Sequence, residues 1–295
     1  MELLIVGGGP AGLTAALYAA RAGKDVTLIE SIAHGGQMNT TPDIENFPAF
    51  LSIPGFELSQ SMQKQAKNAG VRFLFDVIEK IEKTSSGFLC IGRQNQYEAE
   101  KVILATGAER RKLSVPGEEE FTGRGISYCA VCDGNFFRNK NVAVVGGGNT
   151  ALEDALYLAK ICKKVTLIHR RDSFRAAKVY LDRLKNTDNI ELFLNTIVEK
   201  IEGDDVVRSL RLKIDEDEKV LPVSALFIAV GTKPFLPILP PEVERDENGC
   251  LMTDREMRTS LPGLYAAGDV RNTPLRQIVT ACADGAIAGN TAANE

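Results

Sequence analysis

The chain contains an ungapped internal repeat, and this repeat restricts the possible folds more than any other feature. Residues 3–30 read LLIVGGGPAGLTAALYAARAGKDVTLIE and align with residues 142–169, VAVVGGGNTALEDALYLAKICKKVTLIH. In each copy an apolar run precedes a glycine-rich turn, an amphipathic stretch and a second apolar run. This order is typical of a βαβ unit. The sequence therefore predicts the same strand–helix–strand unit twice.

The likeness between the two halves continues beyond the βαβ unit. VRFLFDVIEKIEK (71–83) and ILATGAE (103–109) recur as IELFLNTIVEKIEG (190–203) and FIAVGTK (227–233). Because whole domains recur, we predict an α/β chain with two Rossmann-like three-layer domains. The first begins at Met1, the second begins near residue 113, and the repeat ends near Gly231. The segments 115–125 and 231–242 are rich in Pro, Gly and charge, and they are the predicted linkers.

Composition and charge exclude several classes of protein. A chain of 295 residues with 44% hydrophobic and 25% charged residues is expected to be soluble and globular, and is long enough for two domains. The net charge of -4, without a long Lys/Arg run, argues against nucleic-acid and membrane surfaces. The N-terminus lacks the basic region of a signal peptide, and no apolar run approaches the roughly 20 residues that span a bilayer. We therefore expect a cytoplasmic protein whose partners are small molecules or proteins.

The first glycine loop predicts a dinucleotide site. Gly7, Gly9 and Gly12 fit G-x-G-x-x-G between a strand and a helix, which allows a tight turn, close approach of a pyrophosphate and close helix packing. Free N–H groups at the start of the helix would face the phosphates. Glu30 ends the second strand about 20 residues later, where a carboxylate accepts from a ribose diol. This site should take a dinucleotide without a 2′-phosphate.

The second copy differs from the first in the residues at and after the end of its second strand. The loop itself has Gly146, Gly148 and, at the third glycine position, Ala151. The residues at and after the strand end are His169, Arg170, Arg171 and Arg175. Guanidinium groups suit a 2′-phosphate through bidentate charge-assisted bonds, so this site is predicted to bind NADP(H), with a solvated basic patch as the alternative. Two dinucleotide sites indicate electron transfer, and a flavin beside a nicotinamide is the usual pairing.

The motif CAVCDG holds Cys129, Cys132 and Asp133, and it has three interpretations. A zinc site needs four ligands, but the chain has no second C-x-x-C and only two histidines, so no metal site is predicted. A reducing compartment disfavours a static disulfide. A redox pair at a helix start, where a thiolate is stabilised, fits best. The remaining cysteines are interpreted as small core residues; they are Cys90, Cys162, Cys250 and Cys282.

Asp133 has two interpretations that its chemistry alone leaves open. Its charge would oppose a neighbouring thiolate, so it makes more sense as a proton donor and acceptor, provided burial favours its neutral form. It could equally serve as a helix N-cap.

Further motifs extend these observations to a known family. They are GGQMNTTPDIENFP (35–48), ATGA (105–108), GLYAAGDV (263–270) and RQIVTACADG (276–285). Together with both glycine loops, HRRDSFRA and CAVCDG, they make the chain resemble the low-molecular-weight thioredoxin reductases of the pyridine nucleotide-disulfide oxidoreductase group. The resemblance covers nearly the whole length. Asn149-Thr150, where Asp-Ser is frequent, and Cys282-Ala283, where small residues including Gly are common, depart from the family pattern but keep size and hydrogen-bonding capacity.

The resemblance implies where the cofactors bind. FAD would be held by residues 1–112 and 233–295, and an NADPH domain, 113–232, would be inserted between them. The implied FAD contacts, beyond the glycine loop, are Glu30, Gln37, Asn46, Ala105, Gly107, Asp269, Arg276 and Gln277. The implied NADPH contacts, beyond Gly146, are Gly148, Asn149, Thr150, His169, Arg170, Arg171 and Arg175. A homodimer and a large rotation between the domains are also implied.

The resemblance also implies an activity. Electrons would pass from NADPH to FAD, then to the Cys129–Cys132 disulfide and finally to a disulfide of thioredoxin or a thioredoxin-like protein, with Cys132 nearer the flavin. Two alternatives are a flavin-dependent dithiol oxidase, for which loss of the arginine motif would be expected, and a non-catalytic NADPH sensor, which would not need redox cysteines. No motif identifies which thioredoxin is the partner.

Overall fold

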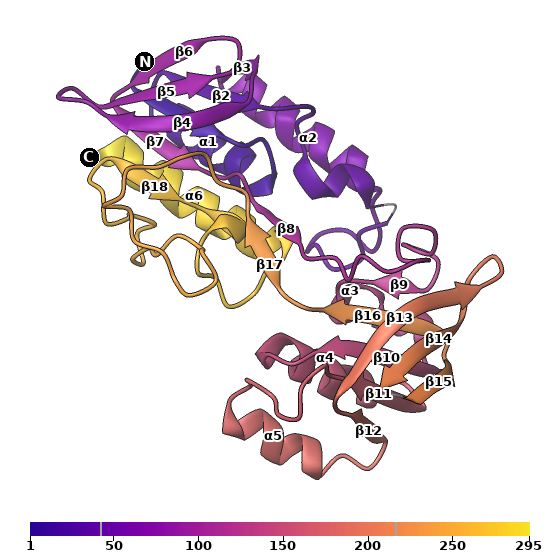
Figure 1. Ribbon diagram of the computed structural model, residues 1–295. Helices are drawn as coiled ribbons and strands as arrows, with labels where there is room; N and C mark the ends of the chain where they lie inside the picture. Colours follow the sequence, from indigo (N-terminus) through magenta and orange to yellow (C-terminus); the bar gives the residue numbers. More distant parts are fainter. Residues whose placement is uncertain (42, 216) are drawn as a thin grey trace. The chain divides into compact units, whose positions relative to one another are not determined.

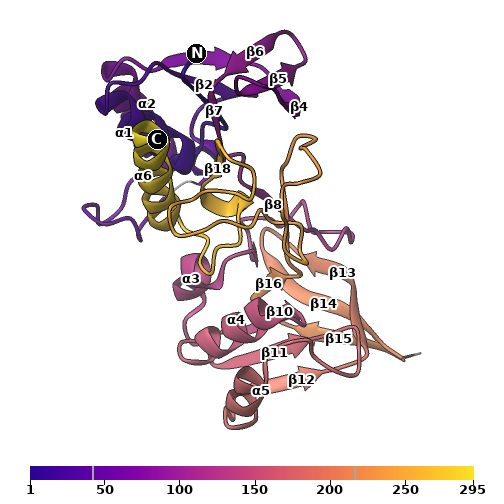
Figure 2. The same ribbon diagram turned by 90° about the vertical axis from the view of Figure 1, so that its left-hand side faces the viewer.

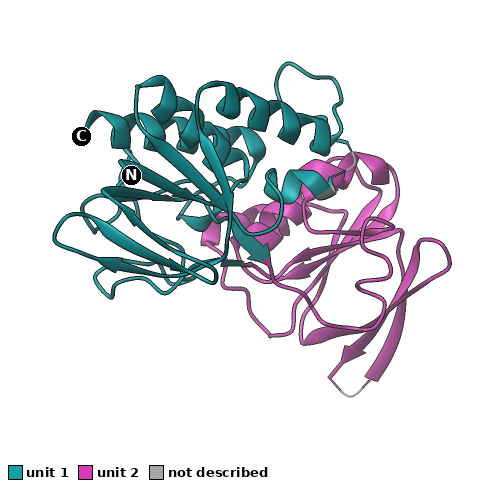
Figure 3. Cartoon of the chain, turned by 90° about the horizontal axis from the view of Figure 1, so that it is seen from above, with its two compact units in different colours: residues 1–109, 233–295 teal, residues 110–232 magenta. Residues whose placement is uncertain are grey.

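The computed structural model describes residues 1–41, 43–215 and 217–295, which divide into two compact units. Unit 1 comprises residues 1–109 and 233–295, and unit 2 comprises residues 110–232 (Figure 3). Sequence analysis placed the corresponding boundaries after residues 112 and 232. In this described part of the chain, no helix is long and apolar enough to cross a membrane. Unit 1 is thus built from two segments that are far apart in the sequence.

Unit 1 is organised around a parallel five-stranded sheet with the strand order β18-β7-β1-β2-β3 (Figure 1). Its strands are β1 (Leu3–Val6), β2 (Val26–Glu30), β3 (Arg72–Phe75), β7 (Lys101–Leu104) and β18 (Leu264–Ala266). In the centre, Leu4 lies opposite both Thr27 and Val102. The edge strand β18 pairs with β7 through Leu264, opposite Val102. The C-terminal segment therefore completes the sheet that the N-terminal segment begins.

The two faces of this sheet carry different layers. One layer contains α1 (Pro10–Arg21), α2 (Gly55–Asn68) and α6 (Ile278–Asn294), and the other is an antiparallel sheet of β4 (Ile78–Lys83), β5 (Phe88–Gly92) and β6 (Gln96–Ala99). Short 3-10 turns occur at η1 (Gly36–Thr40) and η3 (Gly268–Val270). In β1, Leu3 and Ile5 join the helical core, while Leu4 and Val6 join the core under the antiparallel sheet. Successive strand residues point to opposite faces, so unit 1 has three layers.

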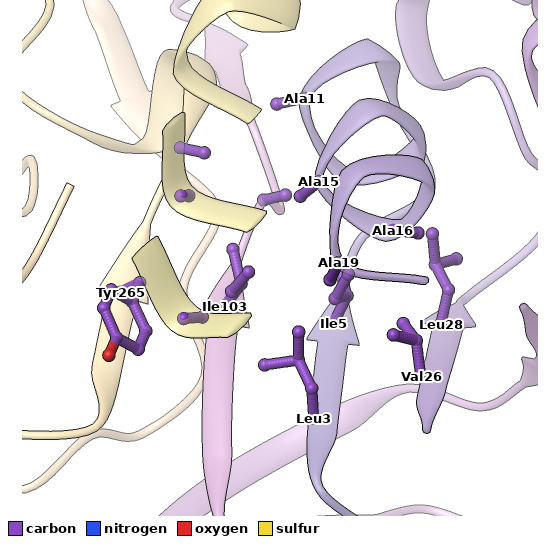
Figure 4. Packing of buried hydrophobic residues seen from close by; sticks show 14 of the residues in the cluster. Leu3, Ile5, Ala11, Ala15, Ala16, Ala19, Val26, Leu28, Ile103 and Tyr265 are labelled. Carbon is purple, nitrogen blue, oxygen red and sulfur yellow. The ribbon is translucent and has the colours of Figure 1, made fainter. Parts of the chain in front are cut away.

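Helices α1 and α6 lie side by side over the parallel sheet (Figures 1 and 2). In the buried cluster of Figure 4, Ala11 and Ala15 of α1 face the α6 ribbon. A Cβ atom at Gly285 would overlap the carbonyl oxygen of Ala11, and one at Gly289 would overlap that of Ala15. Only glycine at these two positions of α6, one turn apart, lets the helix backbones approach so closely.

Unit 2 repeats this architecture around a parallel sheet with the order β12-β11-β10-β16-β9. The strands are β9 (Ile126–Ser127), β10 (Asn141–Gly146), β11 (Lys164–Ile168), β12 (Ile190–Phe193) and β16 (Ala225–Ala229). The helices are α3 (Ala130–Asp133), the 3-10 turn η2 (Gly134–Phe137), α4 (Asn149–Ala159) and α5 (Lys178–Lys185), and the antiparallel sheet has β13 (Thr196–Gly203), β14 (Val207–Ile214) and β15 (Asp217–Pro222). In β10, Val142 and Val144 pack with α4, while Ala143 and Val145 pack under the antiparallel sheet.

The two units share four corresponding strands in the same order. β3, β2, β1 and β7 of unit 1 correspond to β12, β11, β10 and β16 of unit 2. The fifth strand differs in origin, because β18 comes from the C-terminal segment whereas β9 precedes the glycine loop of its unit. The predicted fold class, an α/β chain with two Rossmann-like three-layer domains, is confirmed.

The chain passes between the units at β8 (Ala108–Arg110) and β17 (Thr232–Pro234), which pair with each other in a two-stranded sheet. The predicted linker 231–242 contains the second of these crossings. The predicted linker 115–125 is wrong, because it lies inside unit 2. There Glu118 is 2% exposed and accepts hydrogen bonds from the Leu113 and Ser114 amides and from the Tyr128 hydroxyl. The composition of this segment signalled its turns but could not show the partners of its buried carboxylate.

The substitution Gly285→Ala should destabilise the protein by about 1–3 kcal/mol, because the added methyl group forces α6 away from α1. The midpoint of urea unfolding, followed by circular dichroism, measures this loss. Ala283→Ser, on the exposed side of the same helix, is the matched control and should change stability by less than about 0.5 kcal/mol. An unchanged midpoint for Gly285→Ala would show that the helices do not need this close contact.

Candidate functional site

The first glycine loop is shaped by close backbone contacts, with open space at one position. Gly7 has φ 107°, and a Cβ there would overlap the backbone of Ala105. A Cβ at Gly12 would overlap the carbonyl oxygen of Gly7. By contrast, no atom of the described residues lies within 4 Å of a Cβ placed at Gly9, directly before α1. The loop therefore leaves a phosphate free access to the N–H groups at the start of α1.

Glu30 ends β2 beside this loop. One carboxylate oxygen accepts from the Gly8 amide at 2.7 Å, and the other accepts from the amide and hydroxyl of Ser31 at 2.6 and 2.7 Å. The second of these oxygens also accepts from the Ile32 amide at 3.4 Å, whereas the first, Oε2, accepts one bond from the described residues and keeps a lone pair for a ribose hydroxyl. The structure thus fixes Glu30 to the glycine loop at the position that the sequence predicted for diol binding.

His34 lies beneath the same loop and is one of the two histidines that were too few for a zinc site. Its ring is 8% exposed and packs against Phe73 and Phe75, with centroid distances of 4.7 and 5.0 Å. Burial lowers the pKa of His34, although Glu30 opposes this effect, so the ring is neutral at neutral pH. A Cβ at Gly8 would lie 2.7 Å from its Nδ1 atom, which explains why the middle position of the loop is also glycine.

Hydrogen bonds hold several of the remaining predicted FAD residues in place. Gln37 Nε2 donates to the Ala108 carbonyl at 2.9 Å, and Asn46 Nδ2 donates to Gln277 Oε1 at 3.0 Å. Gln277 is the N-cap of α6, with a capping box formed by Thr280. The contact between Asn46 and Gln277 brings the N-terminal segment to the start of α6. Gly107 has φ 73° and open space at its Cβ position.

Asp269 lies in η3, and a residue that the sequence did not identify holds this turn in place. Asp284 of α6 accepts from the Gly268 amide at 3.1 Å and from Arg271 at 3.0 Å. Both side chains of this ion pair are only 12% exposed. The buried pair therefore fixes the turn that carries Asp269 next to the start of α1.

Buried polar atoms without protein partners support the presence of a ligand in unit 1. In the described part of the chain, Arg276 Nε and both ring nitrogens of His34 have no hydrogen-bond partner. Such groups are rare in native interiors, where buried donors are nearly always satisfied. Among the described residues, the side chain of Arg276 donates one hydrogen bond, to Cys250 Sγ at 3.5 Å. A buried N–H donor without a protein acceptor, such as Arg276 Nε, fits a site for an acceptor-rich ligand such as FAD.

The second glycine loop places His169 where the first has Glu30. A Cβ at Gly147 would overlap the His169 ring, whereas the Cβ position of Gly148, just before α4, is open. The segment after His169 folds back on the loop, because the Arg175 amide donates to Gly147 O and the Ala177 amide donates to Asn149 Oδ1, both at 2.8 Å. These hydrogen bonds hold the segment after the strand end against the glycine loop.

The three predicted arginines belong to this segment. Arg170, Arg171 and Arg175 are exposed, and within the described ranges none makes a side-chain hydrogen bond or ion pair. Unpaired guanidinium groups beside an open glycine loop can bind a phosphate in bidentate fashion. The arrangement therefore suits a 2′-phosphorylated nucleotide.

The cysteine pair forms a disulfide, with a distance of 5.3 Å between the Cα atoms of Cys129 and Cys132. Helix α3 begins directly after Cys129, as predicted, and the Cys132 amide donates to Cys129 Sγ at 3.2 Å. Because an N–H group points at this sulfur, the same geometry can stabilise a thiolate when the bond opens.

The side chain of Asp133 contacts Ser127 and makes no capping hydrogen bond to η2, so the capping interpretation is wrong. Ser127 Oγ donates to Asp133 Oδ2 at 2.6 Å and accepts from the Cys129 amide at 3.0 Å. The sequence offers no indication of Ser127, because a single serine before a C-x-x-C motif carries no readable signal. The hydroxyl links the two ends of the motif.

The four remaining cysteines differ in burial. Cys90, Cys162 and Cys250 are buried, as predicted, while Cys282 on α6 is only partly buried. Burial raises the pKa of Cys90 to about 12 and also raises the pKa values of Cys162, Cys250 and Cys282. These thiols stay protonated at neutral pH, which leaves Cys129 and Cys132 as the redox-competent pair.

Residues 1–285 match the family described as pyridine nucleotide-disulphide oxidoreductase. The chain belongs to this family. Among curated members, a thioredoxin reductase from Listeria innocua is 46% identical over 295 residues, covering 99% of this chain and 92% of that protein. The predicted resemblance to low-molecular-weight thioredoxin reductases is therefore confirmed.

Solved structures agree with this pyridine nucleotide-disulphide oxidoreductase assignment. The thioredoxin reductase of Streptococcus pyogenes is 44% identical with a TM-score of 0.90, over 99% of this chain and 96% of that one. The thioredoxin reductase of Giardia duodenalis is 38% identical with a TM-score of 0.93, over 99% and 97% of the two chains. Flavin and pyridine nucleotide use, together with disulfide chemistry, is what unites the family.

Replacing Arg170 and Arg171 together by alanine should weaken NADPH binding by several kcal/mol, at about 1.5–3 kcal/mol per charged hydrogen bond, and leave NADH binding nearly unchanged. Isothermal titration calorimetry with both nucleotides measures the difference. The matched control replaces Arg208 and Arg211 by alanine. This removes the same charge from the same unit, but these two arginines lie in β14 and already have acidic partners. Equal losses for NADPH and NADH would contradict recognition of the 2′-phosphate.

Proposed function

We propose that the chain is an NADPH-dependent thioredoxin reductase. The observation that carries the proposal is the position of the Cys129–Cys132 disulfide, which lies in the same compact unit as the arginine-bearing nucleotide loop. Unit 1 supplies a second nucleotide loop, next to Glu30, that lacks such arginines. A nicotinamide site, a flavin site and one redox disulfide are the parts that this reaction needs. The relatives named thioredoxin reductase support the same conclusion.

The proposal assigns one cofactor to each unit. FAD bound to unit 1 would accept a hydride from NADPH and pass its two electrons to the disulfide. The residues proposed to hold FAD are Gly7, Gly9, Gly12, Glu30, Gln37, Asn46, Ala105, Gly107, Asp269, Arg276 and Gln277. The residues proposed to hold NADPH are Gly146, Gly148, Asn149, Thr150, His169, Arg170, Arg171 and Arg175. The open space at Gly9 and Gly148 leaves room for the phosphates of both nucleotides.

The cysteines and Asp133 carry the proposed chemistry. Two electrons and two protons convert the Cys129–Cys132 disulfide into two thiols. One thiolate then attacks the disulfide of the partner protein, and the other cysteine resolves the mixed disulfide, which releases a reduced partner and restores the original bond. Asp133, beside the pair, gives and takes up a proton in this cycle.

The remaining parts of the proposal concern partners and location. The partner is a thioredoxin or a thioredoxin-like protein, and the enzyme acts as a homodimer in the cytoplasm; the names of the relatives support the first of these, and the family resemblance supports the dimer. The alternative of a dithiol oxidase is disfavoured by the three exposed arginines, since an enzyme that passes electrons to oxygen has no use for them.

The variants Cys129→Ser and Cys132→Ser should each bind FAD and accept a hydride from NADPH, yet fail to sustain thioredoxin reduction. Because Cys132 is proposed to lie nearer the flavin, only Cys129→Ser should show a thiolate-dependent change in the spectrum of the oxidised flavin. Absorbance spectra and a coupled thioredoxin assay test both points. Cys282→Ser is the control and should keep the parent rate. The spectral change in Cys132→Ser would reverse the assigned orientation, and parent activity in either active-site variant would exclude the motif as the working pair.

Asp133→Asn should keep the fold and the flavin content but slow thioredoxin reduction by roughly 10²–10⁴, the range for general acid-base catalysis. The amide keeps the shape of the carboxyl group but cannot give or take up a proton. Steady-state turnover measures the loss, and Asp205→Asn, an exposed acid of the same unit, is the control. Full activity in Asp133→Asn would remove Asp133 from the reaction.

A further inference from the structure

Ser127 touches three polar groups of the redox motif with one oxygen atom. It is the second residue of β9, pairs with Phe227 of β16 and is 4% exposed. Its Oγ lies 2.6 Å from Asp133 Oδ2, 3.0 Å from the Cys129 amide nitrogen and 3.3 Å from the Cys129 carbonyl oxygen. A serine hydroxyl has one proton to donate and two lone pairs. It can therefore serve only one of the two acceptors at a time.

The contact distances show which acceptor is used when Asp133 is ionised. The 2.6 Å separation between Ser127 Oγ and Asp133 Oδ2 lies in the range of charge-assisted O–H···O⁻ bonds. The hydroxyl then donates to the carboxylate and accepts from the Cys129 amide. This arrangement satisfies the negatively charged Asp133 and the Cys129 amide, while the Cys129 carbonyl oxygen accepts from the Asp133 amide at 3.1 Å.

The same oxygen can also serve a protonated Asp133. The carboxyl O–H would donate to the second lone pair of Ser127 Oγ, and the serine proton would turn to the Cys129 carbonyl oxygen, 3.3 Å away. The Cys129 amide keeps its acceptor in both arrangements. Rotation of a single hydroxyl thus keeps Asp133 hydrogen-bonded in both charge states, and no buried polar group is left without a partner.

We propose that Ser127 is a positioning residue that holds Asp133 in both protonation states and so lets this carboxyl group lose and regain one proton in every turnover. The inference rests on the proposed function, in which Asp133 carries the proton. When the disulfide opens, the hydride of NADPH accounts for two electrons and one proton, and Asp133 supplies the second proton to a departing sulfur. The resulting carboxylate regains its proton from water.

The contact with the Cys129 amide gives Ser127 a second effect on the geometry. The hydroxyl ties the backbone of Cys129, which carries the first sulfur, to Asp133, which follows the second, while the Cys132 amide donates to Cys129 Sγ. The carboxyl group is therefore held at a fixed place relative to the sulfur that the amide polarises. Loss of the hydroxyl should affect proton delivery and leave hydride arrival unchanged.

The test follows the flavin absorbance of the FAD-loaded enzyme after rapid mixing with NADPH. A first phase reports hydride arrival, and a second phase reports passage of electrons to the disulfide. Ser127→Ala should slow the second phase by about 10–100-fold, as expected for loss of one hydrogen bond to a charged group, and leave the first phase and FAD content unchanged. The pH dependence of the second phase should move to higher pH, because a carboxylate without its donor is more easily protonated.

A double-mutant cycle separates this role from a structural one. If Ser127 acts through Asp133, adding Ser127→Ala to Asp133→Asn should slow the second phase by less than about 3-fold more, since the two residues are coupled. Additive losses in the double variant, or a parent rate in Ser127→Ala, would overturn the inference. If Asp133→Asn alone keeps the parent rate, the proposed proton carrier is wrong as well. If the second phase is slow in Asp133→Asn but has the parent rate in Ser127→Ala, only the proposed role of Ser127 is excluded.

Two further comparisons control for folding. Thr196→Val deletes another buried hydroxyl of unit 2, one that donates to the Leu194 carbonyl, and it should leave the second phase unchanged. Ser127→Thr and Ser127→Val have the same shape but differ in the hydroxyl, so they provide the answer even if the alanine variant does not fold. The threonine variant should recover the parent pH dependence and the valine variant should not. The same pH dependence in both variants would contradict the proposal.

Discussion

The close contact between α1 and α6 is the interaction on which the first nucleotide site depends. Gly285 and Gly289 allow α6 to lie directly on the carbonyl groups of α1, and Gly12 allows α1 to lie on the turn at Gly7. The start of α1 is thereby fixed against the C-terminal segment, which brings Gln277 and η3 to the glycine loop. Without this contact, two segments that are distant in the sequence would not meet at the proposed FAD site.

The two units present different side chains to the two proposed nucleotide sites on the same framework. Both place a side chain of the second strand end beneath the middle glycine of the loop. In unit 1 this is Glu30, whose carboxylate binds the Gly8 amide, and in unit 2 it is the His169 ring under Gly147. A carboxylate would repel a phosphate, whereas a neutral ring does not, and burial indeed lowers the pKa of His169. The neighbouring arginines can then attract the extra phosphate without a competing charge.

The sequence was sufficient for features encoded in local patterns. The repeat predicted both parallel sheets and their layers, and the spacing of glycines predicted the loops and the helices that follow them. Features that depend on tertiary partners could not be predicted. Glu118 makes the segment 115–125 an integral part of unit 2, and Asp284 fixes the turn at Gly268, but both look like ordinary surface acids in the sequence. Ser127 could not be predicted for the same reason, since its proposed role follows from its distances to Cys129 and Asp133.

The paired crossing strands β8 and β17 bear on the ancestry of the chain. The Arg111 amide donates to Gly231 O and the Phe235 amide donates to Gly107 O, both at 3.0 Å, so the inserted stretch leaves and re-enters unit 1 at adjacent points. An ancestral chain with a single nucleotide-binding unit needs only a hairpin turn to connect these points. A duplicated gene segment placed in that turn adds a second domain without breaking either sheet, because domain insertion is tolerated where the two ends lie close together. The geometry of this junction is thus compatible with an origin in which one copy of the domain was inserted into the other.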